Sequence, residues 1–383
     1  MGFGYPTPNA GRRADLQELH IHPRLDQTSK PATIEILRCW LFLLLGIGPA
    51  LPAVAGERQP AALVVVSDNA TAAFFDAMTG EAFSNVAFEA KPVDIVGYKQ
   101  SVIVALDGGQ GDILALSALN GGEIWRTTVG FEIAGLTTSA DGQIIAAGAN
   151  GGFARLGAAT GGRLSGGKLP FRPGILAHAD TRGRIVMSPR SARSRVASLN
   201  PNASEHLDPS DLAMIDFGGG IVKMAVAEKH GLIFAQVNGY NGFKVAEADG
   251  DGDVRRVKHE RSLGLPSLIR EFGFLDFNGF NRCEGLAVRP GEREVWSTCG
   301  KNLNVHLIEK GDFPAKGHMR MPGKGSWISF APDGAQAFVT VPDDNAILVV
   351  DAGSLQFIRT IEIDRDPERT IVIPLTGKAG SDD

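Results

Sequence analysis

A run of carboxylates at 249–253, with the sequence DGDGD, offers potential metal ligands, and Glu260 follows it. These carboxylates match positions 1, 3, 5 and 12 of the twelve-residue loop that binds calcium in helix-loop-helix sites. The sixth position of that loop requires a glycine for its sharp turn, and here it is Val254. The run is therefore interpreted as an acidic hairpin turn, and a calcium site is the alternative.

The segment 261–282 combines aromatic and charged side chains. The residues concerned are Arg270, Phe272, Phe274, Asp276, Phe277, Phe280 and Arg282. Four phenylalanines so close together are too apolar to remain in water, so they must pack against the protein, a partner or each other. Charged groups at the rim of an aromatic patch orient a bound partner. We predict that this segment contributes a binding surface; the alternative is that the phenylalanines only pack the segment onto the protein.

Two cysteines have the spacing of a disulfide within one hairpin, while the third lies in the predicted signal peptide described below. If the hairpin is centred on Gly291, Val288 faces Glu294 and Cys283 faces Cys299. Directly opposed residues have Cα separations that a disulfide tolerates. We therefore predict a Cys283–Cys299 disulfide, which suits an oxidising compartment.

No other pattern specifies catalysis. The eight histidines are scattered, and none has the spacing of a zinc site once His20 and His22 of the leader are set aside. His178 falls on a strand expected to line a central channel, where we interpret it as a packed or solvated histidine, with a general base as the alternative. The chain has no Gly-x-Ser-x-Gly, phosphate-binding loop or dinucleotide-binding glycine motif. We expect no resident cofactor or metal, and the catalytic residues, if any, are unknown.

Composition and charge narrow the functional classes. The net charge of −5 argues against a nucleic-acid-binding protein, which usually has a basic excess. A hydrophobic fraction of 43% is sufficient for a large core. The 48 glycines are spread along the chain, as many tight turns between short strands require.

Residues 34–55 have the pattern of a secretory signal peptide. Arg38 precedes a short apolar run, which ends in the small residues at 53–55. The run is far shorter than the roughly 20 residues that cross a bilayer. We predict cleavage after Ala55 and export to the periplasm or the exterior, so that no integral membrane protein remains; an uncleaved anchor is the alternative. Residues 1–33 form a polar leader or an over-extended start.

Turn signals recur through the rest of the chain, between short runs rich in valine, isoleucine, leucine, alanine and phenylalanine. The turns lie at 97–100, 139–142, 180–183, 228–231, 289–292 and 331–334. Most of the intervals are in the forties, which is typical of four-stranded propeller blades. We predict an all-β, seven-bladed β-propeller of four-stranded antiparallel blades over 56–375, with a flexible tail at 376–383.

The two ends of the predicted propeller complete each other. The segment 62–66 begins a blade after its innermost strand, and 370–373 is an innermost strand that no blade follows. Pairing these strands closes the ring and removes an exposed sheet edge.

One interval of the repeat, between residues 231 and 292, is longer than the others because it contains the insertion 261–282. In a propeller this connection emerges on the same face as the loops that follow the second strand of each blade. Those loops hold Arg190, Arg193, Tyr240, Lys301 and Asp343. Binding residues concentrate on loops held by a rigid scaffold, so we predict that this face carries the binding site.

The segment 326–363 resembles the YVTN-type repeat of seven-bladed propellers. The resemblance is carried by ISFAPDG at 328–334, AFVT at 337–340 and AILVVD at 346–351, and 284–308 is a weaker copy. This superfamily is similar to the heavy chain of quinoprotein amine dehydrogenases and to lactonase-type and WD40-like propellers. The resemblance implies the fold, and its motif consists of turn and strand residues without catalytic content.

Two hypotheses for function follow. The first is an exported, non-catalytic binding scaffold for a protein, a glycan or a small ligand on the insertion-bearing face. The second is a lactonase-like hydrolase or a structural subunit of a periplasmic quinoprotein dehydrogenase. An acid, a base and an arginine that converge at the channel mouth would favour the enzyme, whereas mixed polar loops without such a cluster would favour binding.

Overall fold

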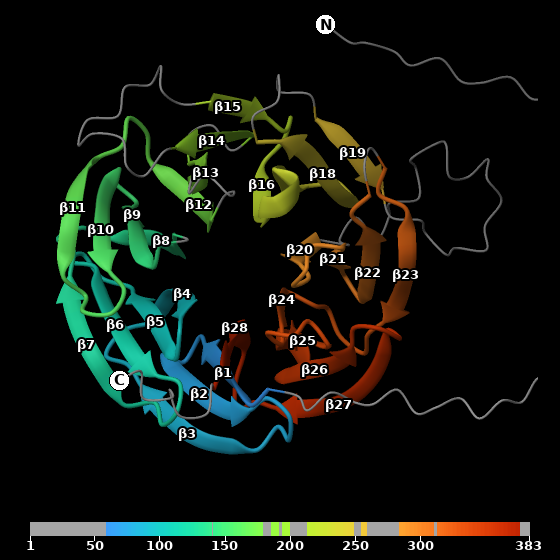
Figure 1. Cartoon of the computed structure of the whole chain (residues 1–383), viewed down its shortest axis with the longest axis horizontal. Helices are drawn as coiled ribbons and strands as arrows, with labels where there is room; N and C mark the ends of the chain where they lie inside the picture. The colour runs from blue at the N-terminus through green and yellow to red at the C-terminus, as the bar shows by residue number, and fades with distance from the viewer. Residues whose placement is uncertain are drawn as a thin grey trace, which may run out of the picture. The chain divides into compact units, whose positions relative to one another are not determined.

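A computed structural model of the chain describes residues 59–139, 141–178, 185–190, 194–199, 213–248, 254–258, 283–309 and 312–375. These residues form seven four-stranded antiparallel sheets, which are arranged as blades in a ring around a central axis (Figure 1). The predicted seven-bladed β-propeller is therefore confirmed. The predicted leader, signal peptide, acidic run, insertion and tail lie outside the described residues.

We number the blades from the one that contains the first strand, and give the strands of each from the channel outward. Blade 1 consists of β28 (Pro367–Pro374), β1 (Ala61–Ser67), β2 (Thr71–Asp76) and β3 (Ala82–Ala87). Blade 2 consists of β4 (Pro92–Tyr98), β5 (Ser101–Leu106), β6 (Asp112–Ser117) and β7 (Glu123–Thr128). Blade 3 consists of β8 (Ile133–Thr138), β9 (Gln143–Gly148), β10 (Gly152–Gly157) and β11 (Arg163–Lys168).

The remaining blades follow the same order. Blade 4 consists of β12 (Pro173–His178), β13 (Ile185–Pro189), β14 (Arg195–Leu199) and β15 (Ala213–Asp216). Blade 5 consists of β16 (Ile221–Ala227), β17 (Leu232–Val237), β18 (Gly242–Glu247) and β19 (Arg255–Lys258). Blade 6 consists of β20 (Cys283–Val288), β21 (Glu294–Cys299), β22 (Asn302–Leu307) and β23 (Ala315–Arg320). Blade 7 consists of β24 (Trp327–Phe330), β25 (Gln336–Val341), β26 (Ala346–Asp351) and β27 (Gln356–Glu362). Two 3₁₀ turns, Glu228–His230 and Pro342–Asp344, lie in loops.

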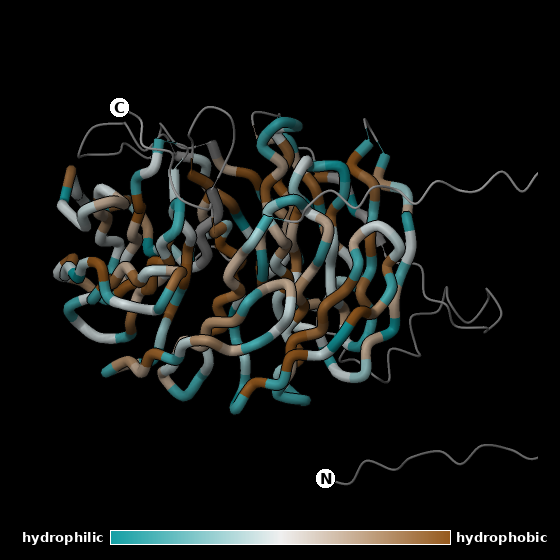
Figure 2. The backbone as a smooth tube through the Cα atoms, turned by 60° about the horizontal axis from the view of Figure 1, so that its bottom comes forward, coloured by the Kyte–Doolittle hydropathy of each residue, from teal (hydrophilic) through white to brown (hydrophobic). Residues whose placement is uncertain are grey.

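The sequence pattern of each strand follows from its place in the blade. The second strands β1, β21 and β25 are buried along their whole length, because neighbouring blades cover both of their faces. Their residues are accordingly rich in valine, alanine and other apolar types, as in strands buried on both sides. The outermost strands alternate between exposed and partly buried residues, as β7 and β23 do. Figure 2 shows the hydrophobic stretches along the strands and the hydrophilic ones at many of the turns.

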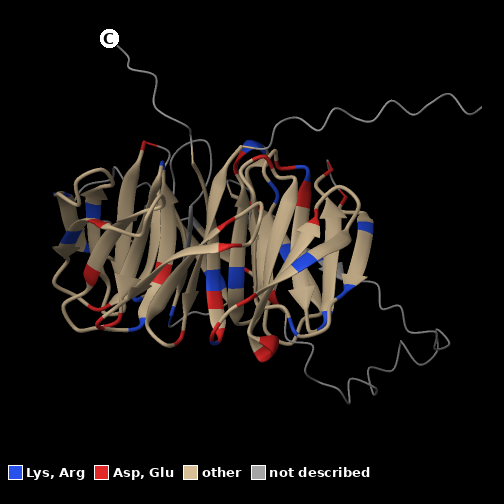
Figure 3. Cartoon of the chain, turned by 90° about the horizontal axis from the view of Figure 1, so that it is seen from below, with Lys and Arg blue, Asp and Glu red and all other residues tan. Residues whose placement is uncertain are grey.

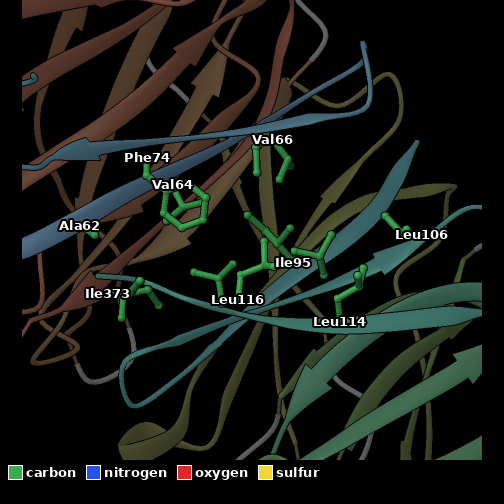
Figure 4. Packing of buried hydrophobic residues seen from close by; sticks show 13 residues of the cluster. Ala62, Val64, Val66, Phe74, Ile95, Leu106, Leu114, Leu116 and Ile373 are labelled. Atoms are coloured by element: carbon green, nitrogen blue, oxygen red, sulfur yellow. The ribbon is translucent and has the colours of Figure 1, made fainter. Parts of the chain in front are cut away.

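Blade 1 closes the ring with strands from both ends of the propeller. β1 pairs with β28 in antiparallel register, with Leu63 opposite Val372. On the blade 2 side, the buried side chains of Val64 and Phe74 belong to one hydrophobic cluster with Ile95 (Figure 4). The predicted closure is confirmed, and it leaves no unpaired edge on β1.

The predicted disulfide joins β20 to β21, and its closed loop is short, because the sequence separation of Cys283 and Cys299 is 16. The register predicted for the hairpin around it is wrong by one residue. Val288 pairs with Val295 instead of Glu294, because the turn is one residue longer than a hairpin centred on Gly291 allows. A bulge between Cys283 and Gly285 shifts the register back, and this shift brings the two cysteines opposite each other.

Candidate functional site

The innermost strands bring one equivalent residue from each blade to the same end of the channel. In every blade this residue pairs with the penultimate residue of the second strand, as Asp94 does with Ala105 and Lys223 does with Gln236. The seven residues, which we call the mouth layer, are Asp94, Gly135, Ile175, Lys223, Gly285, Trp327 and Arg369. The layer lies near the start of the innermost strands, and therefore at the face from which the sequence predicts the insertion to emerge.

Three side chains of the mouth layer converge although they come from different blades. The Nζ atom of Lys223 lies 3.2 Å from the centroid of the Trp327 ring. The guanidinium carbon of Arg369 lies 5.1 Å from the same centroid. In the ring, β20 lies between the strands of Lys223 and Trp327, and its residue in the layer is Gly285, which has no side chain. Two cations therefore share one aromatic ring at the channel mouth.

Hydrogen bonds fix the acidic and aromatic members of this group. Asp94 forms an ion pair with Arg369 across the boundary between blades 2 and 1. The second carboxylate oxygen of Asp94 accepts a hydrogen bond of 2.9 Å from the backbone N–H of Leu136. The indole N–H of Trp327 donates to the carbonyl of Thr370 at 3.0 Å. The site is thus held in place before any ligand arrives, as effective binding requires.

The Lys223 amine differs from these groups because, within the described residues, it has no hydrogen bond or ion pair. Burial lowers the pKa of Lys223 well below its ordinary value of 10.5, and the positive charge of Arg369 lowers it further. The carboxylates of Asp94 and Glu284 act in the opposite direction. Lys223 therefore offers hydrogen-bonding capacity that the described protein groups do not use.

Lys223 opens into a pocket of about 410 Å³, which we call pocket A. Its lining consists of Asp68, Lys223, Ser326, Trp327, Pro342, Asp366, Glu368 and Arg369. The two cations come from within the innermost strands, whereas the acidic groups stand on loops or at the start of β28. Pocket A therefore presents donors at its base and carboxylate acceptors at its rim.

A second pocket of about 460 Å³, pocket B, adjoins pocket A at the same face. Its lining consists of Lys91, Pro92, Val93, Asp107, Glu132, Ile133, Ala134, Ala149, Pro173, Gly174, Arg190 and Glu368. Glu368 lines both pockets, and it forms an ion pair of 2.7 Å with Lys91. Lys91 also forms an ion pair with Asp68 of pocket A. Six of the seven innermost strands contribute lining residues to the two pockets.

Of the residues predicted from sequence to bind, four lie in the described part of the chain. Arg190 is exposed and lines pocket B. The Lys301 ammonium donates to the carbonyl of Pro322 at 2.6 Å, and Asp343 lies 3.9 Å from Lys324. Neither Lys301 nor Asp343 lines pocket A or pocket B.

Tyr240 also lines neither pocket, and it is partly buried. Its hydroxyl has no hydrogen-bond partner among the described residues, and burial raises its pKa. The Nζ atom of Lys244 lies 5.7 Å from the centroid of its ring. The other predicted binding residues lie outside the described ranges; they are Arg193, Arg270, Phe272, Phe274, Asp276, Phe277, Phe280 and Arg282.

Sequence reasoning did not identify Lys223, Trp327, Arg369 or Asp94. These residues lie on strands, whereas the sequence search concentrated on loops. The signal was nevertheless present, because the residue that pairs with the penultimate residue of the second strand is charged or a tryptophan in blades 1, 2, 5 and 7. If each innermost strand is aligned by its pairing with the end of the second strand in the same blade, these residues fall in one layer.

Metal and membrane features were also searched. In the described ranges, no group of three or more histidine, cysteine, aspartate or glutamate residues is placed to hold a metal ion. The same part of the chain contains no helix of the length and apolarity needed to cross a bilayer. Figure 3 shows that acidic and basic residues are interspersed over the propeller.

Comparisons with known proteins give the fold but no family. No protein-family model and no curated protein sequence matches the chain. A functionally unknown protein from Desulfotomaculum acetoxidans aligns with a TM-score of 0.62 at 12% identity, over 82% of this chain and 98% of its own. The periplasmic gluconolactonase of Pseudomonas aeruginosa aligns with a TM-score of 0.61 at 12% identity, over 82% and 99%. Hydrazine synthase of Kuenenia stuttgartiensis aligns with a TM-score of 0.59 at 11% identity, over 81% and 100%.

These similarities cover 81% to 82% of this chain and concern the fold described above. The chain therefore has the architecture of the YVTN- and WD40-like propellers, as the sequence resemblance implied. At such low identities the similarity concerns the fold alone, and function must be argued from the channel mouth.

Proposed function

We propose that the propeller binds a small sugar acid in pocket A, with the ligand carboxylate at Lys223 and Arg369. The observation that carries the proposal is the Lys223 amine, which faces pocket A without a hydrogen bond or ion pair among the described residues. A carboxylate supplies the acceptor that this amine lacks, and charge-assisted hydrogen bonds are the stronger kind.

The rim of pocket A supports a ligand that also carries several hydroxyl groups. Asp68, Asp366 and Glu368 are acceptors, and ligand hydroxyls can donate to them. A simple dicarboxylate would be repelled by the same three carboxylates. A polyhydroxylated acid satisfies both the base and the rim of the pocket, and the pocket volume lies within the range common for small-molecule sites.

The test is a calorimetric titration of gluconate into the purified protein and into the Lys223→Met variant. Methionine keeps an apolar chain over Trp327 and removes the charged donor. We expect the variant to bind gluconate at least about tenfold more weakly, which is the scale of one charge-assisted hydrogen bond. Lys229→Met is the matched control, because Lys229 is exposed in the 3₁₀ turn at the opposite face. Gluconate affinity that is equal in all three proteins would contradict the proposal.

Lactone hydrolysis is the second candidate, and the lowered pKa of Lys223 is the observation that favours it. A neutral amine accepts the proton of an attacking water, and the developing oxyanion at the lactone carbonyl would lie beside Arg369. The ring carbon–oxygen bond then breaks, and Lys223 returns the proton to the leaving oxygen. The product is the open-chain hydroxy acid, so both candidates use one pocket. The gluconolactonase among the similar structures belongs to this chemical class by name.

The two candidates differ in their dependence on pH. Binding of a carboxylate needs protonated Lys223, so gluconate affinity should fall as pH rises through the pKa of Lys223. Hydrolysis needs the neutral amine, so the rate above the spontaneous reaction should rise over the same interval. The rate of δ-gluconolactone hydrolysis, measured across pH with the unmodified protein and with the Lys223→Met variant, decides between them. If the rate with the unmodified protein equals the spontaneous rate at every pH, the hydrolase candidate is wrong.

We also propose that this binding takes place outside the cytoplasm. The formed Cys283–Cys299 disulfide supports export, because structural disulfides persist in oxidising compartments. The signal-like segment 34–55 supports it independently. Mass spectrometry of the exported protein should give Gly56 as the first residue, and a full-length cytosolic product would contradict this.

A further inference from the structure

We propose that pocket B is a second subsite, so that the channel mouth takes a two-unit ligand in which a neutral sugar is linked to the sugar acid. This inference rests on the proposed function of pocket A. Pocket B extends that function, because it specifies the length and the charge pattern of the ligand.

The first step is the continuity of the two pockets. Glu368 lines both, and the Lys91 pairs with Asp68 and Glu368 form the ridge between them. The side chains of this ridge are 36% to 50% exposed, so a ligand that crosses it meets exposed polar groups and not a wall of packed apolar side chains. Such exposed ion pairs contribute little to stability, and a ligand can exchange hydrogen bonds with them at small cost.

The second step is the shape of pocket B. Its floor is formed by Val93, Ala134 and Gly174, which are the second residues of β4, β8 and β12. At the equivalent place in blades 1 and 6 the residues are Glu368 and Glu284. Val222 in blade 5 and Ser326 in blade 7 are also small at this place. Pocket B therefore lies along the side of the mouth where small residues stand in consecutive blades, and the larger side chains are the glutamates of blades 1 and 6.

The third step is the charge of pocket B. Two cations, Lys91 and Arg190, face three carboxylates, Asp107, Glu132 and Glu368. This mixture provides donors and acceptors for hydroxyl groups, and its negative excess disfavours a second acid group. A neutral sugar ring suits pocket B, while the acid end of the same ligand suits the cations of pocket A.

The test compares gluconate with lactobionate, in which a galactose is linked to gluconate. We expect calorimetry to give a lactobionate affinity about tenfold higher than that of gluconate, because the second ring gains charge-assisted hydrogen bonds. Arg190→Ala should remove this gain and leave gluconate affinity unchanged. Arg190 is exposed, so the substitution should not affect folding, and an unchanged melting temperature verifies this. Arg320→Ala is the matched control, because Arg320 is exposed on the outermost strand β23 and lines neither pocket.

The outcomes separate the two proposals. A lactobionate advantage that Arg190→Ala abolishes supports the second subsite. If gluconate and lactobionate bind equally to the unmodified protein, the second subsite is wrong and pocket A stands. If neither compound binds, the proposed function itself fails and the subsite fails with it.

Discussion

The two faces of the propeller carry buried charges in different ways. At the end opposite the mouth, Glu294 forms ion pairs of 2.9 Å with Arg289 and 2.8 Å with Lys316, and it accepts the indole N–H of Trp296 at 2.9 Å. At the mouth, Lys223 lies over Trp327 and has no hydrogen bond or ion pair among the described residues. Satisfied buried charges hold a structure together, whereas an unsatisfied one costs stability and is retained where a ligand completes it.

The Glu294 cluster also connects two blades. Arg289 donates to the carbonyl of Gly334 at 2.8 Å, and Lys316 donates to that of Ala352 at 3.2 Å, and both acceptors belong to blade 7. The cluster therefore acts as a structural link between blades 6 and 7, in contrast to the mouth layer. The predictions below test this contrast, from the largest expected effect to the smallest.

Glu294→Gln should destabilise the propeller by about 3 kcal/mol. The substitution removes the negative charge and leaves two cations without their partner. We place the effect at the low end of the range for broken buried pairs, because Arg289 and Lys316 retain 22% and 26% exposure. Urea denaturation measures the change. Glu123→Gln removes an exposed pair with Arg126 and should change stability by less than about 0.5 kcal/mol; equal losses in both variants would refute the structural link.

Removal of the disulfide should cost about 2 kcal/mol, which is the lower part of the usual range because the closed loop is short. The loss should appear in denaturation of the Cys283→Ala, Cys299→Ala double variant. The same disulfide anchors the mouth end of β20, so its loss should weaken gluconate binding. The effect should be smaller than in Lys223→Met, because neither cysteine lines pocket A. A double variant as stable as the unmodified protein would show that the bond does not constrain the fold.

The stability difference between the unmodified protein and Glu294→Gln should shrink in acid. Burial raises the pKa of Glu294, but Lys316, Trp296 and Arg289 outweigh it and hold the pKa below its ordinary value of 4.5. The stabilisation is therefore complete above pH 4.5 and is lost as pH falls through the lower folded-state pKa. Denaturation curves from pH 7 to pH 3 check this. A difference that stays constant over that interval would exclude a linked protonation of Glu294.

Lys223→Met should have the smallest effect on folding, within about 0.5 kcal/mol. The substitution loses a contact with Trp327 but also removes a charge that the described protein groups do not satisfy. Thermal denaturation measures the effect. A loss as large as that of Glu294→Gln would mean that Lys223 is a structural residue, and it would remove the basis of the proposed site.

The fold was readable from sequence because each blade is specified locally. The turns 139–142 and 331–334 stand between apolar strands, and the left-handed backbone at Gly142, with φ of 75°, requires a glycine there. The pairing of 62–66 with 370–373 followed from counting strands. The hairpin register around Gly291 was wrong because a longer turn and a bulge cancel at the cysteines, and sequence spacing does not reveal such compensation.

The site was less readable because it has no local motif. Lys223, Trp327 and Arg369 are far apart in sequence and come from three blades, and they meet only because the ring brings the innermost strands together. Arg190, which the sequence predicted because it stands on a loop, lines pocket B, and its role in binding stays a prediction. The insertion 261–282 remains a prediction, as do its phenylalanines and arginines.

The most direct test of the account measures stability and binding in the same two variants. Lys223→Met should lose at least about tenfold in gluconate affinity and keep its free energy of unfolding, because its amine serves the ligand. Glu294→Gln should lose about 3 kcal/mol of unfolding free energy and keep its gluconate affinity at neutral pH, because its carboxylate serves the fold. If binding and stability fall together in both variants, the division between a structural face and a ligand-binding face of the propeller is wrong.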